Sequence, residues 1–289
     1  MPDRRRKSRL AFDNVGLKPL IRKARLVLLD PLHSNPRLPW AQAINDAQSR
    51  LQPLQPIHVQ VDVAGLSRAL RLVWMSDLHA GPTTGDVIIE QAARAAAAFE
   101  PHVLLLGGDY VYYDAHAVER LRPLVRRCAG SLATLAIYGN HDCYAKRTPV
   151  MSVLVEEGAV ELCNASRVIE GLHVAAVDDY AFGEPDGAAA LRDVPADAPL
   201  LFMTHNPDAI VELGTRRAAL SLAGHTHGGH VCLPNGRPLL MPTQLGYLAG
   251  RYETRWGPLV VSRGVGSIDV PFRTFARPDV LLVELRPLR

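Results

Sequence analysis

The sequence has few cysteines and no long apolar run, and these two absences already exclude several classes of protein. Its 289 residues include four scattered cysteines without a C-x-x-C pair, so a disulfide scaffold is excluded and reduced thiols are expected. The longest stretch without Asp, Glu, Lys or Arg runs from Ala218 to Gly236; its three histidines and four glycines exclude a transmembrane helix. Hydrophobic residues make up 48% of the chain and charged residues 21%, which is the balance of a globular protein with an apolar core.

Positive charge is in excess only in the first 25 residues. They hold nine Lys and Arg against Asp3 and Asp13, a local charge of +7, whereas the whole chain carries +3, so the remaining 23 basic and 27 acidic residues sum to −4. We expect residues 1–55 to form a basic leader, partly helical or disordered, and residues 56–289 to form the main domain. The Arg4-Arg5 pair is not followed by the apolar stretch of an export signal, so a cytoplasmic protein is expected.

The leader also contains an amphipathic segment. Between residues 17 and 29, apolar side chains recur at helical spacing with basic residues between them. One interpretation is that residues 1–30 bind peripherally to an anionic membrane, at its inner face. The alternatives are that the leader packs on the main domain or is a solvated tail.

Most of the chain has the apolar pattern of strands and helices in alternation. Residues 57–63 alternate apolar with polar side chains, which predicts a half-buried strand. Further strands are predicted at 70–75, 103–106, 133–138, 172–177, 200–203, 219–223, 259–262 and 280–285, and helices at 40–51, 85–99, 115–127 and 149–157. Thr83 and Asp86 are spaced like a capping pair for the second of these helices. Strands alternate with helices at first and then follow one another directly, which favours a mixed α/β sandwich.

Five of the predicted strands are followed directly by Asp, His or Asn. The five segments are Ser76-Asp77-Leu78-His79, Gly107-Gly108-Asp109, Gly139-Asn140-His141-Asp142, Thr204-His205-Asn206-Pro207-Asp208 and Gly224-His225-Thr226-His227-Gly228-Gly229. Ligand sites lie at the carboxyl ends of strands in sheets of this kind, so the five segments are expected to converge. On an extended segment Asp77 and His79 point the same way, as do His225 and His227. Carboxylates, imidazoles and one amide suit Mn, Fe, Zn or Mg, and we predict a site for two divalent metal ions.

These five motifs resemble those of the calcineurin-like metallophosphoesterase superfamily, over residues 68–289. The chain is most similar to bacterial phosphodiesterases of the YaeI/YkuE type, which also share Val261-Ser262-Arg263-Gly264-Val265-Gly266 and Ala276-Arg277-Pro278. The resemblance implies the metallo-dependent phosphatase fold, an α/β four-layer α-β-β-α sandwich of two mixed sheets flanked by helices. It also implies a hydrolase that cleaves a phosphodiester or pyrophosphate bond by attack of a metal-bridging hydroxide.

The same resemblance implies roles for nine residues at positions that match the motifs. The first metal ion would be held by Asp77, His79 and His227, and the second by Asn140, His205 and His225. Asp109 would bridge the two ions. His141 would face the phosphoryl group or the leaving oxygen, oriented by Asp142.

The substrate is less closely defined by the sequence. The loop from Pro234 to Arg255 is rich in Leu, Met, Pro and Tyr, which suits a lipid-linked substrate such as UDP-2,3-diacylglucosamine, an intermediate of lipid A synthesis; alternatively these residues pack on the sandwich. His230 and Tyr247 are candidate substrate contacts. A metal-stabilised binding module without catalysis and a nuclease or nucleotide phosphodiesterase remain as alternatives. The acidic main domain offers no basic track for nucleic acid, which is therefore not an expected partner.

Overall fold

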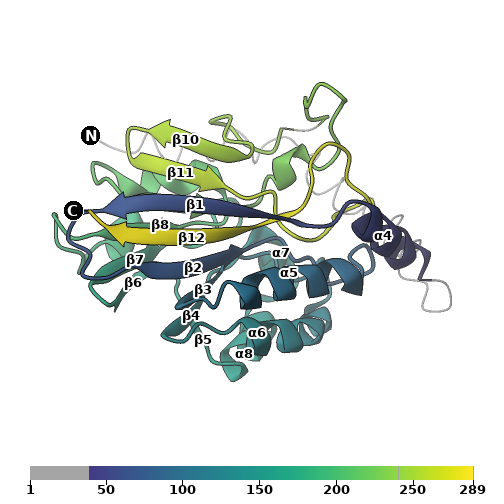
Figure 1. Ribbon diagram of the computed structural model, residues 1–289, viewed down its shortest axis with the longest axis horizontal. Coiled ribbons are helices and arrows are strands. Elements are labelled where there is room, and N and C mark those ends of the chain that lie inside the picture. Colours follow the sequence, from purple (N-terminus) through teal and green to yellow (C-terminus); the bar gives the residue numbers. More distant parts are fainter. Residues whose placement is uncertain (1–38, 240, 289) are drawn as a thin grey trace.

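The structure is a computed structural model of the chain, and it describes residues 39–239 and 241–288. Two six-stranded sheets pack face to face, and helices cover their outer faces (Figure 1). The predicted four-layer sandwich of two mixed sheets is therefore confirmed. The amphipathic segment 17–29 and the predicted membrane contact of residues 1–30 lie outside the described residues.

The first sheet contains both the earliest and the last strand of the described chain. Its order is β1 (Gln55–Val63), β12 (Asp279–Pro287), β2 (Leu70–Met75), β3 (Val103–Leu106), β4 (Ala133–Ala136) and β5 (Ala159–Glu161). Strands β2 to β5 run parallel, whereas β12 is antiparallel to β2 and parallel to β1. The carboxyl ends of β2, β3 and β4 therefore lie at one edge of the sheet.

The second sheet is built from the later part of the chain. Its order is β10 (Gly250–Thr254), β11 (Gly257–Val261), β9 (Leu220–Ala223), β8 (Leu200–Met203), β7 (Leu172–Ala176) and β6 (Ala165–Ile169). Strands β7, β8, β9 and β11 are parallel, and hairpin partners flank them on both sides.

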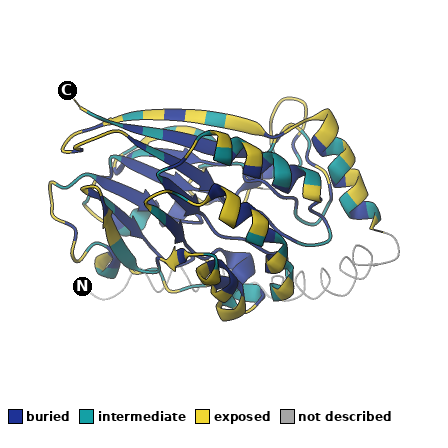
Figure 2. Ribbon diagram, turned by 60° about the horizontal axis from the view of Figure 1, so that its bottom comes forward, coloured by how far each residue is buried: buried dark blue, intermediate teal, exposed yellow. Residues whose placement is uncertain are grey.

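The helices differ in length between the two outer faces. The first sheet is covered by α5 (Asp86–Ala98), η2 (Ala115–Leu121), α6 (Arg122–Cys128) and α8 (Arg147–Glu156), and the second by the short elements α9 (Gly187–Ala190) and η3 (Pro207–Leu213). Two further short elements, α7 (Asn140–Tyr144) and η4 (His227–Gly229), begin in or directly after polar segments at strand ends. The helices expose one side and bury the other, whereas the central strands are buried throughout (Figure 2).

Alternation along each strand divides the core into layers. Leu105 of β3 faces the second sheet, and its neighbours Leu104 and Leu106 face the helices of the first. In β2, Trp74 packs between the sheets in the same way, and all four side chains are fully buried. Because both faces of these strands are covered, β3 is a continuous apolar run and β2 is interrupted only by Arg71.

Some local predictions were wrong. Residues 115–127 form a 3₁₀ helix followed by an α-helix, because Pro123 has no N–H and fits only the first turn of the second helix. Thr83 and Asp86 are not a capping pair: Gly85 is the N-cap of α5, Thr83 donates a hydrogen bond to Ser267 O, and Asp86 accepts one from Arg120.

Helix α4 (Trp40–Leu51) is present as predicted, and it packs on the main domain beside α5. Its buried face includes the polar residues Asn45 and Ser49. Within the described part of the chain, no helix is long and apolar enough to cross a bilayer.

Candidate metal centre

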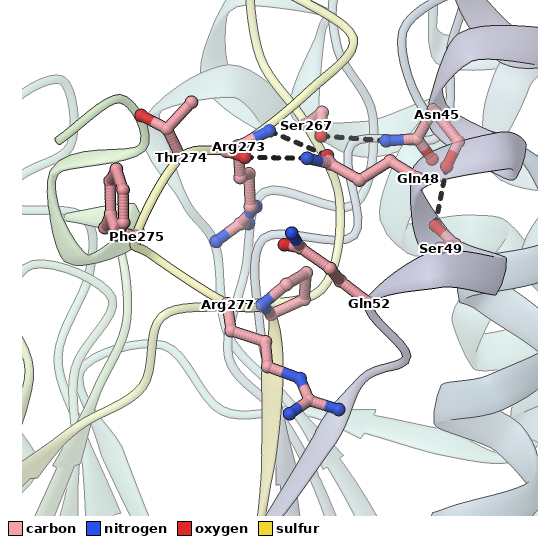
Figure 3. A pocket seen from close by; sticks show the side chains of 10 residues that line it. Asn45, Gln48, Ser49, Gln52, Ser267, Arg273, Thr274, Phe275 and Arg277 are labelled. Atoms are coloured by element: carbon pink, nitrogen blue, oxygen red, sulfur yellow. Dashed lines mark hydrogen bonds between the residues drawn. The ribbon is translucent and has the colours of Figure 1, made fainter. Parts of the chain in front are cut away.

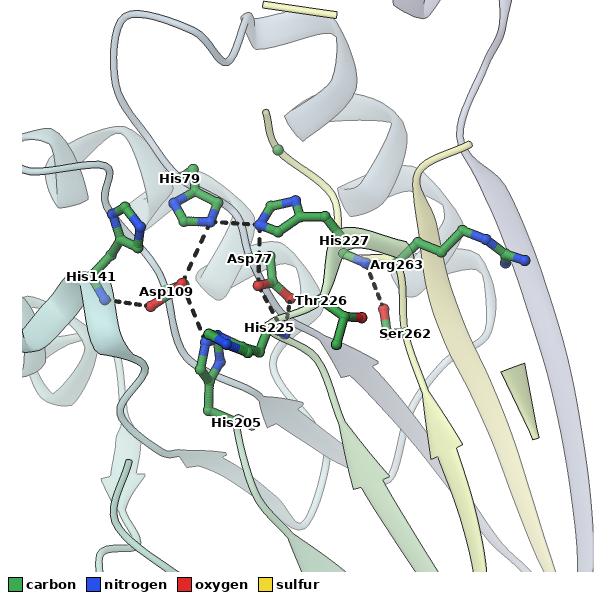
Figure 4. Close-up of polar contacts among 12 residues, drawn as sticks. Asp77, His79, Asp109, His141, His205, His225, Thr226, His227, Ser262 and Arg263 are labelled. Atoms are coloured by element: carbon green, nitrogen blue, oxygen red, sulfur yellow. Dashed lines mark hydrogen bonds and ion pairs between the residues drawn. The ribbon is translucent and has the colours of Figure 1, made fainter. Parts of the chain in front are cut away.

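The polar segments that follow β2, β3, β4, β8 and β9 meet at one edge of the two sheets (Figure 4). Several hydrogen bonds join the two sheets there, and two of them involve the predicted site residues His205, His225 and Asp77. The His205 ring, after β8, donates from Nδ1 to Gly107 O, after β3, over 2.8 Å, and His225 N donates to Asp77 Oδ1 over 3.0 Å. The convergence expected from the strand ends is therefore observed.

One group of side chains comes from the ends of β2 and β9. Nε2 of His227 lies 3.0 Å from Nε2 of His79 and 3.4 Å from Oδ1 of Asp77. The three side chains are buried, and one nitrogen or oxygen atom from each lies within 4.8 Å of the others. Two imidazole nitrogens and a carboxylate facing one another at this distance could hold one metal ion.

Asp109 connects this group to a second one. Its Oδ2 lies 3.6 Å from His79 Nε2 and 3.2 Å from His205 Nε2, and Oδ1 accepts a hydrogen bond from His141 N over 2.7 Å. Asp109, His205 and His225 form another group whose donor atoms lie within 4.8 Å of one another. The carboxylate of Asp109 therefore lies between the two sets of imidazoles.

Two buried polar atoms at this second group have no hydrogen-bond partner. They are Oδ1 of Asn140 and Nε2 of His205. The 3.2 Å contact between His205 Nε2 and Asp109 Oδ2 lacks hydrogen-bond geometry. A buried polar atom left unpaired costs free energy, so atoms of this kind in a native protein call for a partner. A divalent ion would satisfy both atoms, and the residues present therefore fit a metal in this second position.

Burial and charge bring most of these groups to the protonation states that a metal requires. Burial lowers the pKa of His79 and His227 well below the usual value and that of His225 to about 3, so these three rings are neutral. Burial, and then the charge of Asp109, raise the pKa of Asp77 to about 6. Burial is the largest effect on Asp109 and His205 and opposes their charged forms. The histidines around Asp109 together nevertheless lower the pKa of its carboxyl, and the carboxylates around His205, Asp109 first among them, raise that of its ring.

The backbone of the site is strained at most of these residues. The φ angles of Asp77, His79 and Asp109 are 54°, 42° and 55°, and those of His225 and His227 are 71° and 51°. Residues other than glycine rarely adopt such positive φ values, and they do so most often at functional sites. The prediction that Asp77-x-His79 and His225-x-His227 are extended was therefore wrong, although all four side chains do reach the site.

Gly139 and Gly264 have no side chain, and the carboxylates of Asp109 and Asp77 lie where a side chain would otherwise be. A Cβ atom on Gly139 would lie 2.2 Å from Asp109 Oδ1, and one on Gly264, whose φ is +69°, would lie 2.5 Å from Asp77 Cβ. A larger residue at either position would displace the carboxylate beside it. The segment after β11 thus packs directly against the first metal-binding group.

His141 faces the site, but Asp142 does not orient it. The carboxylate of Asp142 accepts hydrogen bonds from the backbone N–H groups of Gly139, Asp109 and Tyr110 at 2.8–2.9 Å, and so fixes the loops. Burial raises the pKa of Asp142 to about 7. Nδ1 of His141 lies 2.5 Å from the backbone oxygen of Tyr112, which can only accept, so this nitrogen carries a proton. The prediction that Asp142 orients His141 was wrong.

The ring of His141 also lies close to the metal-binding groups. With His79 and Asp109 it forms a third set of donor atoms within 4.8 Å of one another. A role in metal binding is therefore an alternative to contact with the phosphoryl group.

Arg273 was not predicted as a site residue, yet it contacts His227 of the first metal-binding group. Its buried guanidinium donates from Nη2 to Nδ1 of His227 over 2.9 Å. A guanidinium can only donate, so Nδ1 accepts and the proton of the neutral ring lies on Nε2, toward His79. A metal ion at Nε2 would displace that proton, and the deprotonated ring would keep its hydrogen bond from the guanidinium. No sequence motif marks Arg273, which lies 46 residues beyond His227.

A cavity of about 680 Å³ opens beside the centre. Asp109, Asn140, His141, His225, His227 and His230 line it on one side, and Val231, Leu239, Pro242, Ile268, Val270 and Phe272 line much of the rest. His230 therefore lies where a substrate would contact it. Tyr247 does not line this cavity; it is half-buried in the core outside the second sheet, 5.0 Å from the ring of Tyr252.

The chain is similar in sequence to known metallophosphoesterases. The profile of the calcineurin-like phosphoesterase family matches residues 70–229, more than half of the chain. The chain is 28% identical over 202 residues to the uncharacterized metallophosphoesterase YkuE of Bacillus subtilis, covering 65% of this chain and 68% of that protein. It is 29% identical over 228 residues to phosphodiesterase YaeI of Escherichia coli, covering 74% and 82%. A dimetal phosphatase structure from Danio rerio matches at 11% identity and a TM-score of 0.42, covering 69% and 88%.

Proposed function

The chain belongs to the calcineurin-like phosphoesterase family, and from that premise we propose that it hydrolyses a phosphodiester or pyrophosphate bond with the help of two divalent metal ions. The observation that carries the proposal is the convergence of five strand ends, which forms groups of three carboxylate and imidazole side chains whose donor atoms lie within 4.8 Å of one another in each group. The similarity to a relative named as a phosphodiesterase supports a diester as the substrate.

The proposed ligands divide into two sets that share one carboxylate. Asp77, His79 and His227 would hold one ion, Asn140, His205 and His225 the other, and Asp109 would contact both. When bound, the ions supply an activated water and neutralise charge on the phosphoryl oxygens. They would be Mn, Fe, Zn or Mg, which are the ions that oxygen and imidazole donors prefer.

The chain's own contribution to the reaction centres on His141. The Tyr112 carbonyl fixes the proton on Nδ1, so Nε2 is the nitrogen directed at the substrate. A ring that carries a second proton on Nε2 can donate it to the leaving oxygen, an effect worth about 10²–10⁴-fold in rate. Asp142 supports this geometry by fixing the loop that carries His141 to the loop that carries Asp109.

The cavity favours a substrate with an apolar group beside the phosphate. Its polar lining includes four of the proposed ligands together with His141 and His230. Much of the rest is made of aliphatic and aromatic side chains, among them Leu239 and Phe272, which are 61% and 39% exposed. An acyl chain would bury these surfaces, whereas a nucleic acid backbone would need basic residues instead. We infer a lipid-linked pyrophosphate or diester, with UDP-2,3-diacylglucosamine as one compound of this class.

Residues 1–30 are proposed to assist access to such a substrate by binding an anionic membrane. The charge of +7 over residues 1–25 supports this, since basic residues near such a surface contribute about 1 kcal/mol each. Sedimentation with anionic vesicles at low salt should be lost when residues 1–30 are deleted. Equal sedimentation of both proteins would contradict the proposal.

The reaction is tested by hydrolysis of bis(p-nitrophenyl) phosphate with added Mn²⁺, before and after treatment with a chelator. We expect turnover that the chelator abolishes and Mn²⁺ restores. A protein that binds Mn²⁺ without hydrolysing any diester or pyrophosphate would be a binding module instead. Assays of a UDP-linked lipid, cyclic nucleotides and DNA under the same conditions then separate the substrate classes; we expect the lipid to be preferred.

A further inference from the structure

Helix α4 holds the segment between β11 and β12 through the side chain of Gln48 (Figure 3). Gln48 Nε2 donates a hydrogen bond to Arg273 O over 2.7 Å, and Gln48 Oε1 accepts one from Arg273 N over 2.8 Å. One amide side chain thus pairs with both backbone groups of one residue. This arrangement fixes the backbone of Arg273 more closely than a single hydrogen bond would.

Asn45 on the preceding turn of α4 fixes the same segment at two further points. Its Nδ2 donates to Ser267 Oγ over 3.0 Å and to Pro271 O over 3.3 Å, and its Oδ1 accepts from Gly85 N over 2.9 Å. Asn45 is 4% exposed, so these hydrogen bonds are shielded from water. Helix α4, the segment and the start of α5 are therefore tied together by one buried polar side chain.

The segment meets the proposed metal centre through the side chain of Arg273. Besides its bond to His227 Nδ1, the guanidinium donates from Nη1 to Arg263 O over 2.6 Å and from Nε to Gly266 O over 3.0 Å. These partners are carbonyl oxygens and an imidazole nitrogen. The position of the guanidinium therefore depends on the backbone that carries it and surrounds it.

We propose that Gln48 is a positioning residue of the metal centre: it fixes the backbone of Arg273 and, through the guanidinium, the orientation of the His227 ring. The inference rests on the proposed function only in that His227 is taken as a metal ligand. Partners that accept the second ring N–H of a ligating histidine contribute about 10–100-fold to metal affinity. Arg273 donates instead, so its bond would favour the deprotonated ring as the ligand, and we expect an effect of the same order. Helix α4 and Arg273 both lie outside residues 70–229, the part that matches the family profile.

The test is Mn²⁺ binding by isothermal titration calorimetry to the full-length protein after removal of metal. Gln48→Leu removes both hydrogen bonds with little change in volume, and Gln52→Leu is the matched control, since Gln52 is exposed, follows α4 directly and lines the same small cavity. We expect Gln48→Leu to raise the Kd of one Mn²⁺ site about tenfold, the lower end of the range for outer partners of a ligating histidine. Gln52→Leu should leave both this Kd and kcat unchanged.

A double-mutant cycle separates positioning from general stabilisation. In Arg273→Lys, which keeps the charge but loses the planar fork, Gln48→Leu should cause no further loss of Mn²⁺ affinity. An equal loss in both backgrounds, or no loss in either, would overturn the inference. If Gln48→Leu does not fold, Gln48→Glu replaces it with Gln52→Glu as control, because a carboxylate cannot donate to the Arg273 carbonyl.

The outcomes also distinguish this inference from the proposed function. A parent protein that binds Mn²⁺ but hydrolyses nothing would contradict the function alone. A parent that hydrolyses diesters, with a Gln48→Leu variant that binds Mn²⁺ normally, would contradict the positioning role alone.

Discussion

The interiors of the central strands and the segments that follow them differ in almost every physical property. The interiors are apolar, regular and paired on both sides, as in β3, where all four side chains are buried. The segments that follow contain buried charges, backbone at positive φ and polar atoms without partners. The strands therefore contribute most of the stability. The proposed chemistry takes place at their ends, where backbone strain and buried charge lower the free energy of unfolding.

Asp109→Asn is expected to have the largest effect, because it changes a strand-end residue and leaves the strand interiors intact. Asparagine keeps an oxygen for the hydrogen bond from His141 N but loses the charge between the two proposed ion positions. We expect diester hydrolysis to fall to background while circular dichroism and cooperative unfolding persist. Elemental analysis should find less metal than in the parent, and a fully active variant would contradict the assignment of Asp109.

His141→Ala is expected to lower kcat by about 10²–10⁴-fold, most strongly for substrates with poor leaving groups, which need protonation. Metal content should stay near that of the parent, because both proposed ions have other ligands. Since His141 also lies within reach of His79 and Asp109, parallel loss of metal and rate would instead make it a ligand.

Leu105→Ala tests the strand interiors, which are expected to serve stability rather than activity. This fully buried side chain packs between the sheets, so truncation should cost about 2–5 kcal/mol in the free energy of unfolding, measured with urea. Activity per folded molecule should remain close to that of the parent. A variant of normal stability with low activity would show that the strand interior serves the site directly.

Asp77→Asn should raise the free energy of unfolding when metal is absent and lower it, relative to the parent, when metal is present. Without metal, the carboxyl pKa is about 6 in the folded protein against 3.8 in the unfolded chain, so the parent loses stability as pH rises from about 4 to 6. The variant lacks this loss and should gain up to about 3 kcal/mol relative to the parent across that window. With Mn²⁺ at pH 7 the parent should be the more stable, because only it binds the metal fully. The same order under both conditions would contradict the proposed role.

The strand interiors could be predicted because burial on both faces or on one leaves an apolar pattern in the sequence. Strand β10 could not, since Gly250–Thr254 is an edge strand of exposed and half-buried residues without an apolar run. The strand-end residues could be predicted because Gly, Asp, His and Asn in these combinations do not suit packing alone. The backbone geometry that brings them together could not, because positive φ at Asp77 or His79 is set by contacts with the neighbouring loop.

The partners of the site residues were the least predictable part. Asp142 is adjacent to His141 in sequence, yet the ring contacts Tyr112 O, because the carboxylate is already occupied by three backbone N–H groups. Arg273 and Gln48 are distant in sequence from His227, yet Arg273 contacts its ring directly and Gln48 contacts the backbone of Arg273. Such contacts follow from tertiary structure and have no local pattern.

The central claim, that five strand ends form a centre for two metal ions, is tested most directly by anomalous diffraction from crystals grown with Mn²⁺. The account predicts two anomalous peaks about 3.5–4 Å apart. One should be contacted by Asp77, His79 and His227, the other by Asn140, His205 and His225, and both by Asp109. Peaks elsewhere in the molecule, or none at this edge of the sheets in protein that hydrolyses diesters, would contradict it.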